Sequence, residues 1–208
     1  MTRRNRSGVR GRYAKSEQRS TEILDAATTV FATHGYHAGS LRDIAAELDL
    51  SLTSIAHHFG HKFELLEAVL ERADNTENGN EEFDFGSACR ERGVAHATLQ
   101  RVRSNLGRPE LLRLFAILST ESSAPGHPAH AWFVDRYTRK VDALTRAFAF
   151  DQMRGRVQRS RDPHVLSRLL IGAWDGIQLQ WLIDPSTDME QAMSMFFASW
   201  SPGALIDS

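Results

Sequence analysis

Short hydroxyl side chains and two histidines are concentrated in one eight-residue stretch between apolar patterns of helical spacing. Hydroxyl and imidazole groups can donate to and accept from base edges in the major groove of DNA, where each base pair presents its own donor and acceptor pattern. The residues of this array are Ser51, Thr53, Ser54, His57 and His58. The chemistry that this array predicts is the reading of a DNA sequence.

Two further residues flank the array and could hold the DNA backbone. Ser40 and Asp43 have the spacing of a capping box, and a helix that begins at Ser40 could offer a hydroxyl and an amide to a phosphate. Lys62 is the second phosphate candidate. The alternative is that the serines only cap helices and that Lys62 is only solvated, but the complete array at this spacing favours contact with DNA.

The spacing of apolar residues predicts four short helices around the array. The first covers about residues 16–33, and the second begins at Ser40. Asp49 falls in the following turn, the third helix begins at Ser51, and the fourth begins at Lys62. The expected buried positions, in chain order, are Ile23, Ala27, Val30, Phe31, Leu41, Ile44, Ala45, Leu48, Leu52, Ile55, Phe59, Phe63, Leu66, Val69 and Leu70. Two helices joined by such a short turn indicate a helix-turn-helix.

This stretch of about fifty residues resembles the DNA-binding segment of the TetR family of bacterial regulators. The family's T-x-x-x-I-A-x-x-A-G-V-S-x-G-T-L-Y-x-Y-F-x-x-K pattern corresponds here to Ser40, Ile44, Ala45, Leu48 to Ser51, Thr53 to Ile55, Phe59 and Lys62. The first helix also matches, at Ile23 to Ala27, Phe31, Gly35 and Tyr36. Departures from the pattern are Asp49 in the turn, Thr53 at a small position, Ala56 and His58 at the two tyrosines, and Gly60 at the proline. The resemblance implies an all-α fold, with a helix-turn-helix domain followed by a larger helical domain for effector binding and dimerisation.

The distribution of charge agrees with a DNA-binding N-terminal part. The net charge of the 208 residues is −1, but residues 1–62 contain nine basic and six acidic side chains, which leaves the remainder at −4. Residues 1–15 contain six basic residues and no acid, and we expect this arm to be disordered by itself. The arm could touch DNA or be a solvated tail, and the sequence leaves both open. The expected domains are therefore an arm at 1–15, a DNA-binding domain at 16–64 and a body at 65–208.

The body is expected to be helical throughout, with helices at 83–104, 109–122, 128–152, 163–183 and 187–200. The fourth of these is apolar around most of its circumference, which indicates burial on more than one side. We expect the last two helices to form half of a four-helix dimer interface through Gly172, Gly176, Trp181, Met189, Met193, Phe196 and Trp200. The alternative is that both helices only complete the core of one chain.

The family resemblance also implies a cavity in the body that binds a small effector. Candidate lining residues are Phe115, Trp132, Phe133, Arg136, Trp174 and Gln178, although each could equally belong to ordinary core packing. The abundance of aromatic residues and methionine suggests an apolar or aromatic effector. Such an effector would act by favouring one separation of the two DNA-reading helices over another.

Several classes of function are disfavoured by the sequence. No phosphate-binding loop, zinc-protease motif, nucleophile elbow or dinucleotide fingerprint is present, so we expect neither an enzyme nor a cofactor. His57, His58 and His61 do not share one helical face, so we expect no metal. The single cysteine, Cys89, and the lack of a membrane-spanning run or signal peptide suggest a cytoplasmic protein.

The expected function is that of a homodimeric, ligand-responsive repressor that binds a pseudo-palindromic operator. A transcriptional activator and an architectural DNA-binding protein remain as alternatives.

Overall fold

The computed structural model describes the backbone of residues 7–78 and 84–200, and the side chains of residues 15–75 and 84–198. Every regular element in these ranges is a helix, which confirms the predicted all-α fold. The helices are α1 (Ser7–Ala38), α2 (Leu41–Glu47), α3 (Leu52–Phe59), α4 (Lys62–Asn78), α5 (Phe85–Arg92), α6 (Val94–Asn105), α7 (Pro109–Glu121), α8 (His130–Met153), α9 (Pro163–Ile183) and α10 (Met189–Trp200). Within the described ranges, no helix combines the length and apolar character that crossing a membrane requires.

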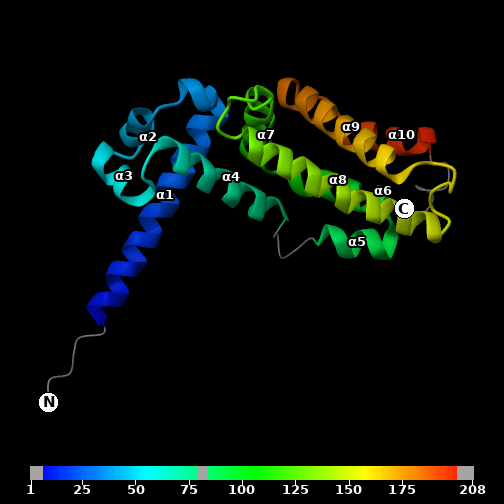
Figure 1. The fold of residues 1–208 in the computed structure, drawn as a ribbon, viewed down its shortest axis with the longest axis horizontal. Coiled ribbons are helices and arrows are strands. Elements are labelled where there is room, and N and C mark those ends of the chain that lie inside the picture. Colours follow the sequence, from blue (N-terminus) through cyan, green and yellow to red (C-terminus); the bar gives the residue numbers. More distant parts are fainter. Residues whose placement is uncertain (1–6, 79–83, 201–208) are drawn as a thin grey trace, which may run out of the picture.

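Helices α1 to α3 form one end of the molecule, and α4 runs from that end towards the body made of α5 to α10 (Figure 1). The two parts share a core, because α1 packs along α7 more extensively than any other two helices pack. Phe31 of α1 and Ile55 of α3 belong to the same buried cluster as Leu114 and Leu118 of α7. A second cluster, around Phe148 and Met193, holds the rest of the body together. We call α1 to α3 the head. The head is therefore anchored on α7.

Local hydrogen bonds fix the ends of the helices around the predicted DNA-reading array. The Ser40 hydroxyl accepts from the Asp43 amide at 3.2 Å, and the Asp43 carboxylate accepts from the Ser40 amide at 2.9 Å, which confirms the capping box. Asp49 has a φ of 52°, the left-handed turn conformation that the sequence indicated. The Ser51 hydroxyl accepts from the Ser54 amide at 3.1 Å and caps α3. These contacts lie within a few residues of one another, which is why the sequence could predict them.

Several helix boundaries differ from the sequence-based expectation. Helix α1 begins at Ser7 rather than near residue 16, because extending an existing helix adds one hydrogen bond for each residue that is ordered. Residues 7–15 of the expected arm are thus helical, and residues 1–6 lie outside the described residues. The expected helix at 83–104 is two helices that meet at Gly93. Helix α10 begins at Met189 instead of residue 187, since the Asp188 carboxylate accepts from the Gln191 amide at 2.8 Å.

Two apolar residues expected to be buried are exposed. Leu52, in the first turn of α3, is 42% exposed, and Phe63, in the first turn of α4, is 39% exposed. Both have the helical spacing of a core position, but no neighbouring helix covers the first turn of either helix closely enough to bury the side chain. Ile55 and Leu66, one turn further along their helices, are fully buried.

Asp151 of α8 fixes the junction between α5 and α6. Its carboxylate accepts from the Val94 amide at 2.8 Å and from the Arg156 guanidinium at 3.1 Å. Gly93 has a φ of 92°, and a Cβ there would lie 3.0 Å from the same carboxylate, so the position suits only glycine. Burial raises the pKa of Asp151, and the bonds from Val94 and Arg156 oppose this effect.

Replacing Asp151 by alanine should therefore lower the free energy of unfolding by about 1–3 kcal/mol, because the Val94 amide would be left buried without an acceptor. Urea denaturation followed by circular dichroism would measure the loss. The control is Asp135→Ala on the same helix, which removes only an exposed pair with Arg139 and should cost about 0–1 kcal/mol. Equal losses for the two variants would contradict the structural role of Asp151.

Candidate DNA interface, ligand cavity and dimer surface

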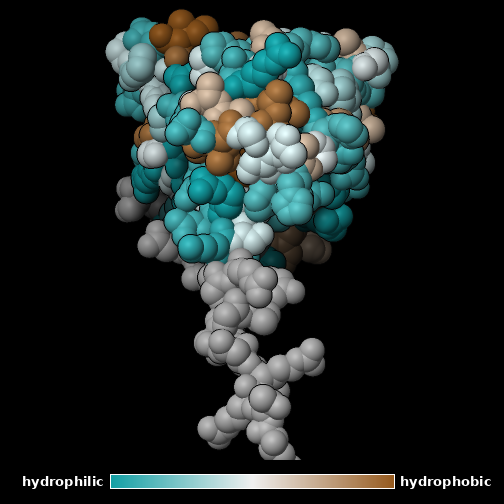
Figure 2. Space-filling model, turned by 90° about the vertical axis from the view of Figure 1, so that its left-hand side faces the viewer, coloured by the Kyte–Doolittle hydropathy of each residue, from teal (hydrophilic) through white to brown (hydrophobic). Residues whose placement is uncertain are grey.

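Helix α3 presents a polar face at the end of the molecule. Ile55 faces the core and is fully buried, whereas Thr53 and His57 are exposed on the other side of the helix. Ser51 is exposed and Ser54 is half-buried. The end of the molecule that α3 belongs to is mostly hydrophilic, with a small hydrophobic area near its middle (Figure 2). A helix exposed in this way can lie in a major groove with several side chains towards the bases.

His58 has a different position from its neighbour His57. Its Nδ1 lies 3.1 Å from the Ser20 hydroxyl of α1, and its ring is half-buried between the two helices. His58 therefore connects α3 to α1, while His57 projects outward. Ser20 lies 38 residues away in the chain, so no local pattern could have indicated this contact.

Lys62 is neither freely solvated nor fully buried. Its Nζ lies 4.3 Å from the centroid of the Tyr36 ring and 3.5 Å from the His37 carbonyl oxygen. Burial lowers the pKa of Lys62, while the carboxylates of Glu121 and Asp43 raise it. The aromatic contact holds the ammonium group at the end of α1, close to the start of α2, where Ser40 is engaged in its capping box. Ser40 and Lys62 thus have structural contacts in addition to the phosphate role expected of them.

Leu52 is a candidate contact that the sequence reasoning missed. Its helical spacing with Ile55 and Phe59 suggested a core residue, but its side chain is exposed beside Thr53. An exposed apolar side chain on a groove-reading helix can contact the methyl group of thymine. The family pattern gave no signal for this position.

A cavity of about 210 Å³ lies in the body and is lined by residues of α5, α6, α7, α8 and α9. Of the six residues expected there, Phe115, Arg136, Trp174 and Gln178 line it. Trp132 lies outside the lining and stacks on Phe115, with ring centroids 6.3 Å apart, and Phe133 is buried in the core shared with the head. The lining residues that the sequence reasoning missed are Phe85, Thr98, Arg101, Leu112, Tyr137, Lys140, Ala143, Leu144, Leu170, Ile171 and Asp175.

The polar part of the cavity wall is rich in cations. Arg101, Arg136 and Lys140 line the cavity together with one carboxylate, Asp175. The guanidinium of Arg136 forms an ion pair with Asp74 of α4 and lies 4.0 Å from the centroid of the Phe115 ring. Burial lowers the pKa of Arg136 to about 10, so this residue remains charged at neutral pH.

Hydrogen bonds orient the remaining polar groups of the cavity. The Tyr137 hydroxyl donates to the Asp175 carboxylate at 2.9 Å, and burial together with this carboxylate raises the pKa of Tyr137 to about 12. The Trp174 indole donates to the side-chain amide oxygen of Gln178, Oε1, at 2.9 Å. The cavity therefore combines an aromatic and aliphatic wall with fixed donors.

An apolar stripe runs along the exposed side of α9. Its members are separated alternately by four and three residues: Val165, Leu169, Gly172, Gly176, Leu179 and Ile183. Ile183 is 76% exposed, and a Cβ added at either glycine would meet nothing within 4 Å. The glycines therefore accommodate no helix of the described part of their own chain. We call these six residues the α9 stripe.

The other residues expected at the dimer interface lie elsewhere. Met189 and Met193 are buried in the second core cluster, so they complete the core of one chain and are unavailable to a partner. Trp181 and Phe196 are half-buried against the same cluster. The side chain of Trp200 lies outside the described residues. Helical spacing alone could not separate these inward-facing residues from the α9 stripe.

Comparison with known proteins relates this architecture to one family. The sequence model of the family described as bacterial regulatory proteins, tetR family, matches residues 23–69, from within α1 to within α4. The A-factor receptor protein of Streptomyces griseus is 26% identical over 168 residues, which are 81% of this chain and 56% of that protein. The chain thus spans little more than half the length of this relative.

Solved structures with the same fold cover nearly the whole chain. One is SmeT, the repressor of a multidrug efflux pump of Stenotrophomonas maltophilia, in a complex with triclosan; it superposes with a TM-score of 0.71 at 18% identity, covering 90% of this chain and 94% of that one. Another is AibR in complex with isovaleryl coenzyme A and operator DNA, with a TM-score of 0.67 at 19% identity, covering 89% and 99% of the two chains. The chain therefore carries a DNA-binding segment of the tetR family of bacterial regulatory proteins at residues 23–69, joined to a helical body that has the fold of these solved regulators.

Proposed function

We propose that this protein is a homodimeric repressor that binds a pseudo-palindromic operator through α3 and releases it when a small effector enters the cavity. The observation that supports this most directly is the position of α3. Ile55 anchors the helix in the core, and Thr53 and His57 project from the end of the molecule. Ser51 and Leu52 lie in the same turn, where the N-terminal part of a recognition helix meets base edges.

Dimerisation is proposed through the α9 stripe. Its alternating spacing of four and three residues is that of a helix packed against another helix. From Val165 to Ile183 the helix rises by about 27 Å, and exposed apolar residues that follow one helical face over this length suggest an interaction site. Gly172 and Gly176 leave room for a helix of the partner to approach closely. A second copy of α9, related by a twofold axis, meets these requirements and also supplies the second reading helix.

The cavity is proposed as the effector site. SmeT, which has this fold, forms a complex with triclosan, AibR forms one with isovaleryl coenzyme A, and a relative is the A-factor receptor protein of Streptomyces griseus. In this chain, Phe115 and Trp174 suit an apolar or aromatic body, and Arg101 and Lys140 suit a hydrogen-bond-accepting end. We therefore extend the sequence-based expectation of an apolar effector to one that also carries an acceptor-rich group.

Repression is proposed as the direction of regulation because SmeT, which shares the fold, is a repressor. Activation by the same contacts would increase, rather than decrease, transcription from a reporter that carries the operator. A reporter assay with and without the protein distinguishes the two directions.

Selection of bound DNA from a random pool tests the proposal as a whole. We expect the recovered sequences to contain two inverted half-sites whose centres are about 10–10.5 base pairs apart, or a multiple of this distance. Recovery of single, unpaired sites would contradict the dimer. Recovery of no preferred sequence would contradict the reading role of α3.

Replacing Thr53 or His57 by alanine should reduce the preference for the operator over random DNA, because both side chains are proposed to contact bases. We expect a loss of about 1 kcal/mol of discrimination for each.

Lys62→Ala should instead weaken binding to all duplexes. It should also reduce by about one the slope of log affinity against log salt concentration, as the loss of a phosphate contact does. Fluorescence anisotropy on both DNAs at several salt concentrations measures these effects. Thr138→Ala, at an exposed position on α8, is the control and should change neither quantity.

Replacing Leu179 by glutamate should produce monomers, since it places a charge in the middle of the proposed interface. Operator affinity should fall together with dimerisation. Sedimentation velocity and anisotropy at matched concentrations test this. The matched control is Leu106→Glu, which changes an exposed leucine at the end of α6 and should leave the dimer intact. A Leu179→Glu protein that still sediments as a dimer would place the interface elsewhere.

A further inference from the structure

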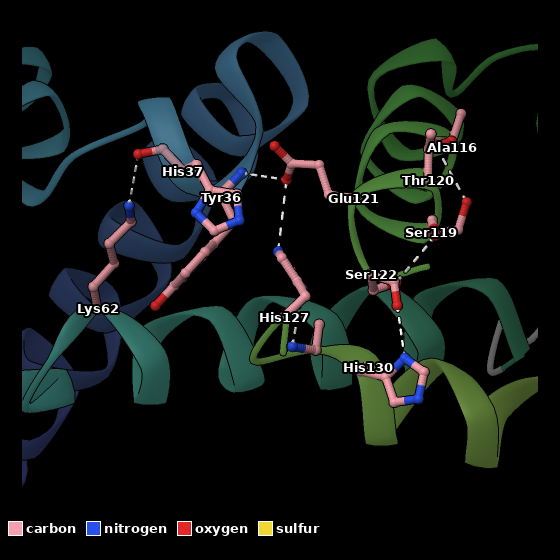
Figure 3. Close-up of polar contacts among 11 residues, drawn as sticks. Tyr36, His37, Lys62, Ala116, Ser119, Thr120, Glu121, Ser122, His127 and His130 are labelled. Atoms are coloured by element: carbon pink, nitrogen blue, oxygen red, sulfur yellow. Dashed lines mark hydrogen bonds and ion pairs between the residues drawn. The ribbon is translucent and has the colours of Figure 1, made fainter. Parts of the chain in front are cut away.

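Polar side chains meet at the junction of the head and the body, outside both the reading helix and the cavity. Glu121, the last residue of α7, lies between the end of α1 and the turn that leads into α8 (Figure 3). Tyr36 approaches it from α1, and His127 approaches it from the turn. None of these three residues reads DNA or lines the cavity in the function proposed above.

The Glu121 carboxylate contacts the backbone of the head directly. Its Oε2 accepts a hydrogen bond from the Tyr36 amide at 2.7 Å. The neighbouring Gly35 has a φ of 72°, and a Cβ there would lie 2.8 Å from Glu121 Cδ. The kink in α1 at Gly35 therefore leaves space for this carboxylate. Any other residue at position 35 would have a strained backbone, and its Cβ would collide with the Glu121 carboxylate.

His127 holds a second donor close to the same oxygen. Its side chain is fully buried, and its Nδ1 accepts from the Ala129 amide at 3.1 Å. In the neutral ring the hydrogen is consequently on Nε2. This nitrogen has no hydrogen-bond partner in the described part of the chain, and it lies 3.8 Å from Glu121 Oε2, the oxygen that accepts from Tyr36. Burial lowers the pKa of His127, with Glu121 opposing and His37 adding to this effect, which favours the neutral ring.

Helix α7 connects this junction to the cavity. Leu112 and Phe115 of α7 line the cavity, and Glu121 follows Phe115 by six residues, about 9 Å along the helix axis. The same helix packs against α1 along its length. A ligand that displaces α7 at Phe115 must therefore move Glu121 relative to either Tyr36 or His127, because a helix transmits a shift along its axis.

We propose that Glu121 is a positioning residue that couples the cavity to the reading head by exchanging donors. In the DNA-binding state, Glu121 accepts from the Tyr36 amide, as it does in this structure, and fixes the head. When the cavity is filled, α7 shifts, Glu121 accepts from His127 Nε2 instead, and the head is released. The exchange satisfies the buried Nε2 donor and frees an amide at the more accessible end of α1. This inference rests on the proposed function, since it needs a cavity whose occupation alters operator binding.

A double-mutant cycle tests the coupling without knowledge of the effector. Ala143 of α8 borders the cavity at a position that is also exposed to solvent, and Ala143→Trp places an indole there as a substitute for a ligand. We expect Ala143→Trp to weaken operator binding by about tenfold in the otherwise unchanged chain, within the range of allosteric coupling. In the Glu121→Ala background, the same substitution should change operator affinity by less than about twofold. Operator binding is measured by fluorescence anisotropy.

Two further backgrounds separate donor exchange from a structural role. His127→Phe keeps an aromatic ring but removes the second donor, so it should also abolish the effect of Ala143→Trp. Glu121→Gln keeps an oxygen that can accept from either donor and should restore most of the effect. Ala131→Trp, at an exposed position on the same helix and away from the cavity, controls for adding an indole. Glu110→Ala, at the other end of α7, controls for removing a carboxylate.

Each outcome decides one point. An effect of Ala143→Trp that is equal in all backgrounds overturns the role of Glu121. An effect that is lost in Glu121→Ala but kept in His127→Phe overturns the exchange of donors. If Ala143→Trp does not alter operator binding even in the unchanged chain, the ligand response in the proposed function fails as well. Should Glu121→Ala unfold, the rate of amide hydrogen exchange at Tyr36 is compared in the unchanged chain and in Ala143→Trp. A faster rate in Ala143→Trp supports the switch of donors at Glu121, and an unchanged rate contradicts it.

Discussion

The packing of α1 against α7 is the constraint on which the rest of this structure depends. A head of this size buries too little apolar surface to be stable by itself, and here Phe31 and Ile55 of the head share a core with Leu114 and Leu118 of the body. Because the contact is apolar, it stabilises the head without fixing its orientation in detail. A directional contact at its edge, from the Tyr36 amide to Glu121, helps to supply that orientation. The position of the reading helix is therefore a property of the body as much as of the head.

The cavity and the α9 stripe lie on opposite sides of α9. One side carries Leu170, Trp174 and Gln178 into the cavity, and the other carries the α9 stripe. A ligand in the cavity and a second chain on the α9 stripe would thus contact the same helix from its two sides. This arrangement gives a physical route by which effector binding could alter the relation between two subunits, in addition to the route through α7.

The polar groups buried in the body differ from those at the junction with the head in whether they have partners. Buried charges are paired or held by aromatic rings, as Arg136 is by Asp74 and Phe115, because an isolated charge is costly in the interior. At the junction the pattern is different, since His127 keeps a buried donor without a partner. This unsatisfied donor lies beside the Glu121 carboxylate, so a small displacement could give it a partner. Such a site responds to small displacements, whereas the fully satisfied contacts of Asp151 resist them.

The sequence by itself determined the features that depend on neighbours a few residues apart. The all-helical fold, the capping box at Ser40 and the left-handed turn at Asp49 follow from helical spacing and local hydrogen bonds. Only the tertiary structure decided which helical face meets which neighbour. Leu52 is exposed and Met193 is buried, although both have the spacing of a core position, because burial depends on an element distant in the sequence. The cations of the cavity and the meeting of Glu121 with Tyr36, 85 residues apart, likewise arise from the packing of whole helices, which no local pattern encodes.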